Sequence, residues 1–575
     1  MASKRKKKSA VAVSPPSKLR THSKLFAFGA VAAFLITSAA IRLRLAETPL
    51  ERDEGEYAYA GQLMLEGIPP YQRAYNMKFP GVYASYAGLM SVFGETTNGI
   101  RLGLILVNAA TALLLFLTAR KLLDDFGAAA ASVSFLVLTL SPAMLGIFAH
   151  ATHFAALFAV AGLLMLLSYD ESKRSVYLLL SGVMFGFGVL MKQHSVFVAA
   201  TGPAWLLSRH LIRGDAAPPA ERQNTQHSDP RTKPDAEGFK ALCGRLLVFL
   251  CGFAIPIALC LLILLRAGVL SQFWFWTFKY ASAYVSQVQL SAAPSALISK
   301  IPRLTEGAVL LWLMAAAGPV ALRWHPGKKS TRAGLLGFAI FSFLACCPGF
   351  YFRQHYFIVL LPAVSLLIGV AYQAAARASE HRGLMMFSLI ALAATSFIYP
   401  FYKNGAVFFE LTPNEVSRRL YGANPFPEAI EIARYVKENS SPTDNIAVLG
   451  SEPEIYFLSG RRSSSGHIYM YGLMEEQPYA RTMQEEFISE VESARPAYVV
   501  LATMNESWLR RPGSEQLVWQ WMDSYIKTDM ELIGVADITA SGTNYLWGKQ
   551  AAGYSGRQGR ALMLYARKSG SSRAE

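Results

Sequence analysis

Long apolar segments recur along the first 400 residues of the chain. The first extends from about Leu25 to Ile41, and others follow at roughly 101–118, 127–148, 153–168, 176–191, 194–208, 241–266, 305–322, 333–350, 355–375 and 384–402. Each is close to the roughly 20 residues that an α-helix needs to cross about 30 Å of hydrocarbon. The pattern predicts an α-helical polytopic membrane protein with about eleven transmembrane helices over residues 25–402.

Lys and Arg in the short connecting segments indicate how this bundle is oriented. Cytoplasmic loops of membrane proteins are enriched in these residues, and the chain opens with the basic tract Lys4–Lys8. If residues 1–24 form a basic cytoplasmic tail, every inner loop carries Lys or Arg: Arg120-Lys121, Lys173-Arg174, 209–240, Arg323 to Arg332 and Arg377 to Arg382. We therefore expect a multi-pass membrane protein with its N-terminus in the cytoplasm and with the outer loop 42–100 and everything after Phe401 on the opposite side of the membrane.

The sequence changes character after about residue 425. Helical periodicity over Pro427–Asn439 and Gln477–Ala494 alternates with short apolar segments at Asn445–Gly450, Ala497–Leu501 and Leu532–Ile538, which predict strands. Residues 425–575 are expected to form a soluble α/β domain outside the cytoplasm. No nucleophile or metal signature occurs within it, so we expect it to be needed for the choice of acceptor rather than for chemistry.

Composition and charge exclude several other classes. Hydrophobic residues make up 53% of the chain and charged residues only 16%, against about a quarter in soluble domains. The net charge of +16 lies largely in short loops and not on a basic stripe with interleaved aromatic residues, so nucleic acid is not an expected partner. The five cysteines lie in or beside apolar segments without metal-ligand spacing, which argues against a disulfide framework or a zinc site.

Ionisable residues are densest at the start of the outer loop, in Glu51–Tyr57. A helix is expected to begin here, which places Asp53 and Glu54 at its N-terminus, where the helix dipole favours their ionised form. An ionised carboxylate that faces a cavity at the membrane surface can act as a general base for a hydroxyl group. The alternative is a solvated loop. A second, interfacial helix is expected over Val82–Phe93.

Basic residues and histidines at the outer ends of apolar segments are the other candidates. Lys78 follows a turn, where its ammonium could hold a phosphate or, alternatively, extend to lipid headgroups. Arg353 lies between two apolar segments, where a charge is costly and usually faces the bundle interior, and Lys192 occupies the same level. His150 and His153 could bind a divalent metal ion, but the absence of carboxylates beside them favours a polar cavity lining.

The order of these residues resembles the first outer loop of the C-type glycosyltransferases. The resemblance rests on these positions: Arg52-Asp53-Glu54, Tyr57-Ala58, Gly67, Pro70-Tyr71, Lys78-Phe79-Pro80-Gly81, Tyr83 and Arg101-Leu102, with Arg353, His355-Tyr356 and Leu361-Pro362 further along. The chain is most similar to family 39, which contains protein O-mannosyltransferases, the aminoarabinose transferase acting on lipid A, and related bacterial sugar transferases. Met77 stands where some relatives carry a Glu that touches a metal, so their metal site is not carried over.

This resemblance implies a membrane glycosyltransferase that moves a sugar from a polyprenyl-phosphate donor to a lipid, glycan or protein acceptor of the cell envelope, with inversion at the anomeric carbon. It implies Asp53 as general base, with Glu54 as neighbour or substitute, and assigns Lys78 and Arg353 to the donor phosphate. Further substrate-binding positions are expected at Tyr57, Arg101, Lys192, His355 and Tyr356.

Two other functions remain open at this point. A flippase or transporter of lipid-linked sugars would show charged or broken helices in the middle of the membrane, whereas the charges of this chain cluster on one outer face. A polysaccharide polymerase or ligase of related fold would still be an enzyme and would differ in its acceptor.

Overall fold

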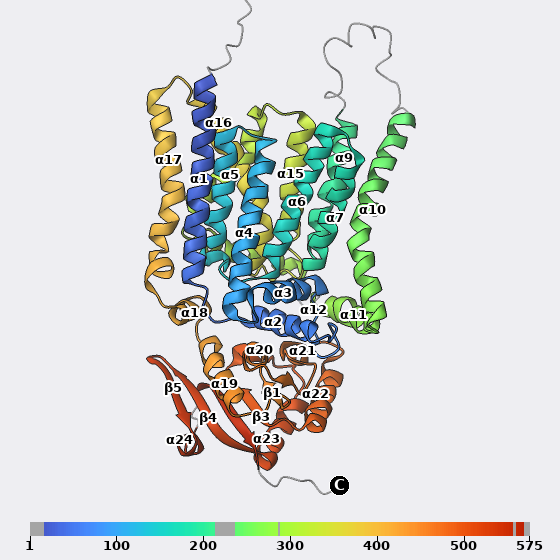
Figure 1. Cartoon of the computed structure of the whole chain (residues 1–575), viewed down its shortest axis with the longest axis vertical. Helices are drawn as coiled ribbons and strands as arrows, with labels where there is room; N and C mark the ends of the chain where they lie inside the picture. The colour runs from blue at the N-terminus through green and yellow to red at the C-terminus, as the bar shows by residue number, and fades with distance from the viewer. Residues whose placement is uncertain (1–16, 213–235, 286–287, 556–558, 569–575) are drawn as a thin grey trace, which may run out of the picture.

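The computed structural model describes residues 17–212, 236–285, 288–555 and 559–568. Residues 1–16, which make up most of the expected cytoplasmic tail, lie outside them. The described chain forms a helical bundle at one end and a smaller domain with a β-sheet at the other, with short helices between them (Figure 1).

A helix occurs in each of the eleven predicted apolar segments. These helices are α1 (Ser17–Arg44), α4 (Thr97–Arg120), α5 (Asp125–Leu140), α6 (Ala151–Ser172), α7 (Ser175–Met191), the pair α8 (Ser195–Ala199) and α9 (Thr201–Leu211), α10 (Ala236–Arg266), α14 (Val309–Ala321), α15 (Lys329–Leu344), α16 (Leu361–Ala378) and α17 (Gly383–Lys403). Six helical stretches of the described chain are long and apolar enough to cross a membrane, and three more are apolar but shorter. The protein is a multi-pass membrane protein.

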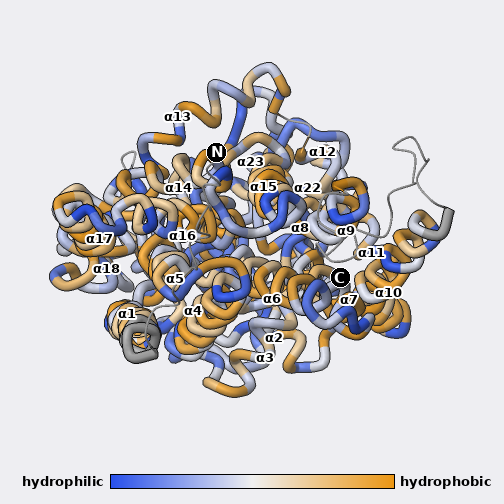
Figure 2. The backbone as a smooth tube through the Cα atoms, turned by 90° about the horizontal axis from the view of Figure 1, so that it is seen from above, coloured by the Kyte–Doolittle hydropathy of each residue, from blue (hydrophilic) through white to orange (hydrophobic). Residues whose placement is uncertain are grey.

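The bundle has an apolar exterior as well as an apolar core. In the most hydrophobic windows of α10 and α17 only 17% of the residues are buried, although the mean hydropathy of these windows is 2.9 and 1.8. Seen from above, α4 and α10 are mainly hydrophobic along their length (Figure 2). Such large exposed apolar surfaces are what lipid tails cover in a membrane protein. By contrast, 94% of the window over Gln354–Ala378 is buried, so α16 forms the centre of the bundle.

Short helices cover the end of the bundle that faces the C-terminal domain (Figure 1). The outer loop contributes α2 (Arg52–Leu65) and α3 (Pro80–Phe93), which match the two helices expected there. Another connection contributes α11 (Leu270–Trp274), the π-helix η3 (Phe275–Tyr280), α12 (Ala281–Val285), η4 (Leu290–Ala292) and α13 (Ala293–Thr305). Short 3₁₀ segments, η1 (Pro142–Met144), η5 (Leu322–Trp324) and η6 (Gln354–Leu360), join bundle helices.

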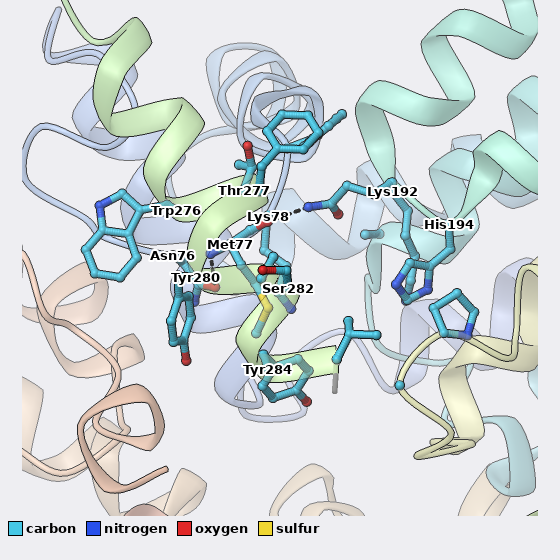
Figure 3. Close-up of a pocket in the computed structure, with 18 of the residues that line it drawn as sticks. Asn76, Met77, Lys78, Lys192, His194, Trp276, Thr277, Tyr280, Ser282 and Tyr284 are labelled. Carbon is cyan, nitrogen blue, oxygen red and sulfur yellow. Dashed lines mark hydrogen bonds between the residues drawn. The ribbon is translucent and has the colours of Figure 1, made fainter. Parts of the chain in front are cut away.

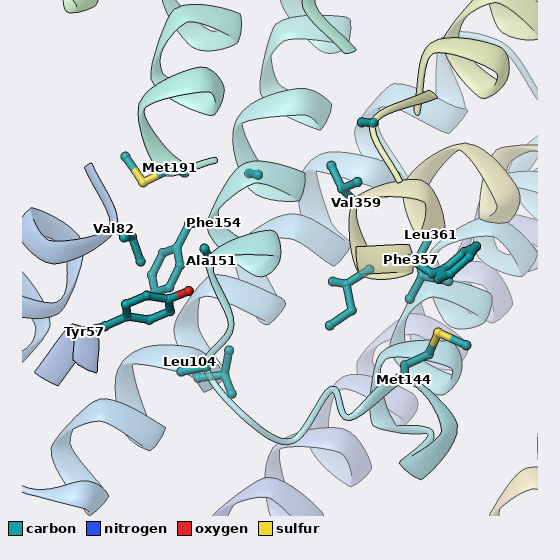
Figure 4. Close-up of a cluster of buried hydrophobic side chains, with 14 of the residues drawn as sticks. Tyr57, Val82, Leu104, Met144, Ala151, Phe154, Met191, Phe357, Val359 and Leu361 are labelled. Carbon is teal, nitrogen blue, oxygen red and sulfur yellow. The ribbon is translucent and has the colours of Figure 1, made fainter. Parts of the chain in front are cut away.

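Hydrophobic side chains hold α2 and α3 against the bundle. Tyr57 and Val82 meet Phe154 of α6 in a buried cluster (Figure 4). Gly81 permits this close approach, because a Cβ there would lie 2.4 Å from the carbonyl oxygen of Leu190 at the end of α7. Packing against α3 and the bundle therefore fixes α2, the helix that carries Asp53.

The C-terminal domain contains a six-stranded sheet with the order β2-β1-β3-β6-β4-β5. Strand β1 (Asn445–Leu449) pairs in parallel with β2 (Arg462–Ser463) and β3 (Tyr498–Ala502), whereas β6 (Arg560–Arg567) pairs antiparallel with β3 and with β4 (Met530–Thr539), which pairs with β5 (Gly542–Trp547). The helical segments are η7 (Ala406–Glu410), α18 (Pro413–Tyr421), α19 (Phe426–Glu438), α20 (Glu454–Ser459), α21 (Tyr471–Met474), α22 (Ala480–Ala494), η8 (Asn505–Ser507), α23 (Leu517–Asp529) and α24 (Lys549–Ala552).

The sequence predicted β1, β3, β4, α19 and α22 but not the three other strands. Strand β2 has two residues, β5 begins with Gly542 and the polar residues Thr543 and Asn544, and β6 has an Arg at each end, so the apolar segment that would mark each strand is short. Tertiary pairing, rather than local pattern, creates these strands.

Candidate active site

A cavity of about 920 Å³ lies where the bundle meets the C-terminal domain. Its bundle side is apolar and is lined by Phe197 of α8, Phe253 and Ile257 of α10, and Leu344 of α15. The opposite side carries polar and aromatic residues from α2, from the connection 267–304 and from the C-terminal domain. In Figure 3, Lys78, Lys192 and Tyr284 come from three separate elements around this cavity.

Asp53 reaches the cavity because of the way α2 begins. Glu51 caps the helix: its side chain accepts a hydrogen bond from the backbone N–H of Glu54 (3.0 Å), and the Glu54 side chain accepts one from the backbone N–H of Glu51 (3.2 Å). This reciprocal capping fixes the first turn. Asp53, in that turn, is only 6% exposed and lines the cavity.

Lys78 is the nearest cation to Asp53. Its Nζ lies 3.4 Å from Oδ1 of Asp53 and donates to the Tyr57 hydroxyl at 3.2 Å. Burial raises the pKa of Asp53, but the positive charges of Lys78 and Arg353 outweigh this effect and hold the pKa at about 2. The carboxylate is therefore ionised at neutral pH.

Lys192 and Arg353 face the same cavity without a carboxylate partner. Nζ of Lys192 lies 3.9 Å from the ring centre of Tyr356, and the Arg353 guanidinium lies 5.8 Å from the ring centre of Tyr351. Within the described chain, no carboxylate oxygen comes within 4.0 Å of either cation. Burial and the charge of Lys78 lower the pKa of Lys192 to about 7, which is the effect expected for a cation that lacks a counter-charge.

Comparisons with known proteins agree on the fold. A sequence model of the dolichyl-phosphate-mannose-protein mannosyltransferase family matches residues 78–216, and no curated protein matches the chain. The structure of ArnT from Cupriavidus metallidurans bound to undecaprenyl phosphate superposes over 93% of this chain and 97% of that one, with a TM-score of 0.57 at 13% identity. The oligosaccharyltransferase AglB from Archaeoglobus fulgidus, in complex with an inhibitory peptide and a dolichol-phosphate, superposes over 95% of this chain and 76% of that one, with a TM-score of 0.52 at 14% identity. The chain has the C-type glycosyltransferase fold.

Five of the predicted site residues do not line the cavity of this C-type fold: Glu54, Arg101, His150, His153 and His355. Glu54 is fully buried and accepts hydrogen bonds from both terminal nitrogens of Arg101, one at 2.9 Å, and from the backbone N–H of Ala149. Arg101 also donates to the carbonyl of Thr48 at 3.3 Å. Glu54 and Arg101 thus tie α2 to α4 and to the segment before α6, and neither is placed to touch a substrate in the cavity.

The histidines come together differently from the sequence prediction. His150 stacks on His355 with ring centres 4.1 Å apart, and His355 Nε2 lies 3.8 Å from Oδ2 of Asp53. Ligand atoms of Asp53, His150 and His355 lie within 4.8 Å of one another, so these three residues, rather than His150 with His153, could hold a metal ion.

Two features of His150 suit that role. Both of its ring nitrogens are buried without a hydrogen bond in the described chain, with Nδ1 3.5 Å from Oε1 of Glu51, and burial lowers its pKa to about 3. A neutral imidazole with free nitrogens is the form that binds metals. The residues present therefore fit a divalent ion.

Sequence reasoning missed Glu56 and Glu475, which also line the cavity. Glu56 lies three residues after Asp53 and accepts a hydrogen bond from the Tyr83 hydroxyl at 2.7 Å. Burial raises its pKa to about 7. Helical spacing could have found Glu56, because residues three apart share a helix face. Nothing in the sequence marks Glu475, which lies more than 400 residues from Asp53.

The C-terminal domain binds α2 through Arg52, the residue directly before Asp53. Arg52 donates to Glu452 at 2.9 Å, to the Tyr471 hydroxyl at 2.8 Å and to the carbonyl of Ser451. Gly55 lets the chains touch, because a Cβ there would lie 2.6 Å from the backbone nitrogen of Glu454. The domain expected to be needed for the choice of acceptor therefore contacts the helix that carries the candidate base.

Proposed function

We propose that the protein is a glycosyltransferase that moves a sugar from a polyprenyl-phosphate donor to a cell-envelope acceptor at the outer face of the membrane that it spans. The cavity carries this proposal, because one ionised carboxylate, Asp53, lies in it with three cations beside an apolar wall. An anionic lipid headgroup requires cations at this depth, its tail requires apolar helices, and a hydroxyl nucleophile requires a base. The fold supports the same conclusion, since ArnT and AglB were solved with undecaprenyl phosphate and a dolichol-phosphate.

The distribution of charge supports an outer-face site. Basic residues of the bundle connections lie at the end away from the C-terminal domain: Arg120-Lys121, Lys173-Arg174, Arg323, Lys328-Lys329 and Arg377. By the positive-inside rule this end is cytoplasmic. The cavity, α2, α3 and the C-terminal domain then lie on the periplasmic side of a bacterial inner membrane.

The reaction is a single displacement at the anomeric carbon. The acceptor oxygen bonds to that carbon, its proton passes to Asp53, and the bond to the phosphate oxygen breaks with its electron pair leaving on the polyprenyl phosphate. A single displacement inverts the anomeric configuration. Arg353 and Lys192 hold the phosphate, because both are cavity cations without a carboxylate partner, and such contacts neutralise the leaving group.

Donor binding itself makes Asp53 a better base. Lys78, Arg353 and Lys192 all lower the pKa of Asp53 in the free protein. A phosphate held by Arg353 and Lys192 neutralises part of their charge, so the pKa of Asp53 rises towards its usual range. Asp53 thus gains basicity when the donor is in place. A divalent ion held by Asp53, His150 and His355 would supply further positive charge for the phosphate and would in turn lower the pKa of Asp53.

Mass spectrometry of the cell envelope tests the proposal. Deletion of the gene should remove one glycan or glycolipid, and the corresponding polyprenyl-phosphate sugar should accumulate. Wild-type protein should restore the product, and Asp53→Asn, which keeps shape but loses basicity, should not. Asp523→Asn, at an exposed position of the C-terminal domain, is the matched control and should restore it. Unchanged glycans and lipid-linked sugars after deletion would exclude the function, and full restoration by Asp53→Asn would exclude the base.

A further inference from the structure

The side of the cavity opposite the apolar wall carries a set of open hydroxyl groups. Tyr284 of α12 and Tyr469 before α21 line this side, and Tyr356 of η6 lines the same cavity beside Lys192. Within the described chain no hydrogen bond reaches any of the three hydroxyls, and none of them is among the buried polar atoms that lack a partner. The three hydroxyls are therefore open to the cavity.

Glu475 supplies a carboxylate to the same side. It is 6% exposed, lines the cavity and accepts a hydrogen bond from the Tyr280 hydroxyl on Oε2 at 2.9 Å. Oε1 receives no hydrogen bond from the described residues and is not sealed from the cavity. Burial raises the pKa of Glu475 to about 7, so this carboxyl group can both donate and accept hydrogen bonds near neutral pH.

Arg353 connects this set to the proposed reaction centre. Its positive charge lowers the pKa of Asp53 and of Glu475. It also interacts electrostatically with the three tyrosine hydroxyls. The guanidinium proposed to bind the phosphate therefore lines the same cavity as the base and the polar set and interacts electrostatically with both. A group attached to a phosphate on Arg353 can reach both.

We propose that Tyr284, Tyr356, Tyr469 and Glu475 form a subsite that holds the hydroxyl groups of a sugar ring. This rests on the proposed function and names the part of the cavity that recognises its sugar. A ring with several hydroxyls matches groups that both donate and accept, whereas a lipid tail there would leave the three tyrosine hydroxyls and Oε1 of Glu475 without partners, which is unfavourable. A site built to hydrogen-bond hydroxyls discriminates strongly against ligands that lack them.

Binding to lipids with and without a sugar tests the subsite. The full-length protein in detergent is titrated with undecaprenyl phosphate and with undecaprenyl phosphates carrying mannose, glucose, galactose or arabinose. The wild type should bind at least one sugar-bearing lipid about tenfold more tightly than the bare lipid. Tyr284→Phe, Tyr469→Phe and Glu475→Gln should each reduce this preference roughly three- to tenfold while the Kd for the bare lipid stays within about twofold.

Tyr75→Phe is the matched control. Tyr75 also lines the cavity, but its hydroxyl already donates to Glu490 at 3.0 Å, so the preference should not change. Unchanged preference in all three test variants would overturn a subsite for the donor sugar. No binding of any lipid by the wild type would instead reject the proposed function, whereas equal binding of bare and sugar-bearing lipids would reject a subsite for the donor sugar and leave the proposed function standing.

A second measurement separates donor from acceptor sugar. Release of undecaprenyl phosphate from the preferred lipid is followed with host membranes as the source of acceptor. If the subsite holds the donor sugar, the variants should raise the donor KM. If it holds an acceptor sugar, they should keep the lipid preference and raise the amount of membrane needed for half-maximal rate. Variants that change neither quantity contradict the subsite.

Discussion

Replacing Arg52 tests whether the C-terminal domain holds the active site in place. Arg52 and Glu452 pair at 2.9 Å with side chains 9% and 0% exposed. Arg52→Ala would leave the Glu452 carboxylate buried without its cation, and breaking such a pair by removing one partner costs about 3–5 kcal/mol. At about 1.4 kcal/mol for each factor of ten, the population with an undocked C-terminal domain should rise by roughly two to three and a half orders of magnitude.

A second, exposed ion pair spans the same two parts of the chain and provides the control. Arg462 lies 3.0 Å from Glu66 just after α2, with side chains 51% and 40% exposed. Exposed pairs contribute about 0–1 kcal/mol, so Arg462→Ala should raise the undocked population fivefold at most.

Hydrogen exchange of the amides in α20, followed by mass spectrometry, measures this population, because exchange reports the free energy of local opening. Equal exchange in the Arg52→Ala and Arg462→Ala variants would refute the idea that the buried pair docks the domain. In a double variant, Arg52→Met with Glu452→Leu, apolar side chains replace both charges. Its exchange should return most of the way to the wild-type rate, since the cost lies in the unpaired charge.

Other predictions separate the roles of neighbouring groups. Asp53→Asn should abolish sugar transfer by purified protein with little loss of thermal stability, whereas Glu54→Gln should mainly lower the melting temperature, because Arg101 would lose its buried counter-charge; the opposite pattern would exchange their roles. Lys192 must be charged to hold phosphate, and binding an anion raises its pKa from about 7. The affinity for undecaprenyl phosphate should therefore be level below pH 7 and should fall up to tenfold per pH unit between pH 7.5 and 9. The Lys192→Met variant should lose this pH dependence. A reporter that works only outside the cytoplasm should be active when fused after Arg573 and silent near Gln223, and the reverse would overturn the orientation.

Local features of the sequence predicted the parts of the site that lie on one element. Asp53 and Lys78 belong to the outer loop, and charges at the ends of apolar segments identified Lys192 and Arg353. The sequence could not decide between Asp53 and Glu54, because adjacent helical residues point about 100° apart and only packing decides which one faces the cavity. The stack of His150 on His355 joins residues 205 positions apart, and no local pattern predicts such a contact.

The sequence did not show which residues of the C-terminal domain reach the cavity. A domain without nucleophile or metal motifs was expected to choose the acceptor rather than to carry out chemistry, and this stays a prediction. In the structure it contributes Tyr469 and Glu475 to the cavity and holds α2 through Arg52. Hydroxyl and carboxylate groups that bind a substrate need no fixed spacing in sequence, since the fold and not the chain brings them together. When two distant parts of a chain enclose a cavity, the sequence identifies site residues clearly only where charged residues cluster. In this protein they cluster in the outer loop.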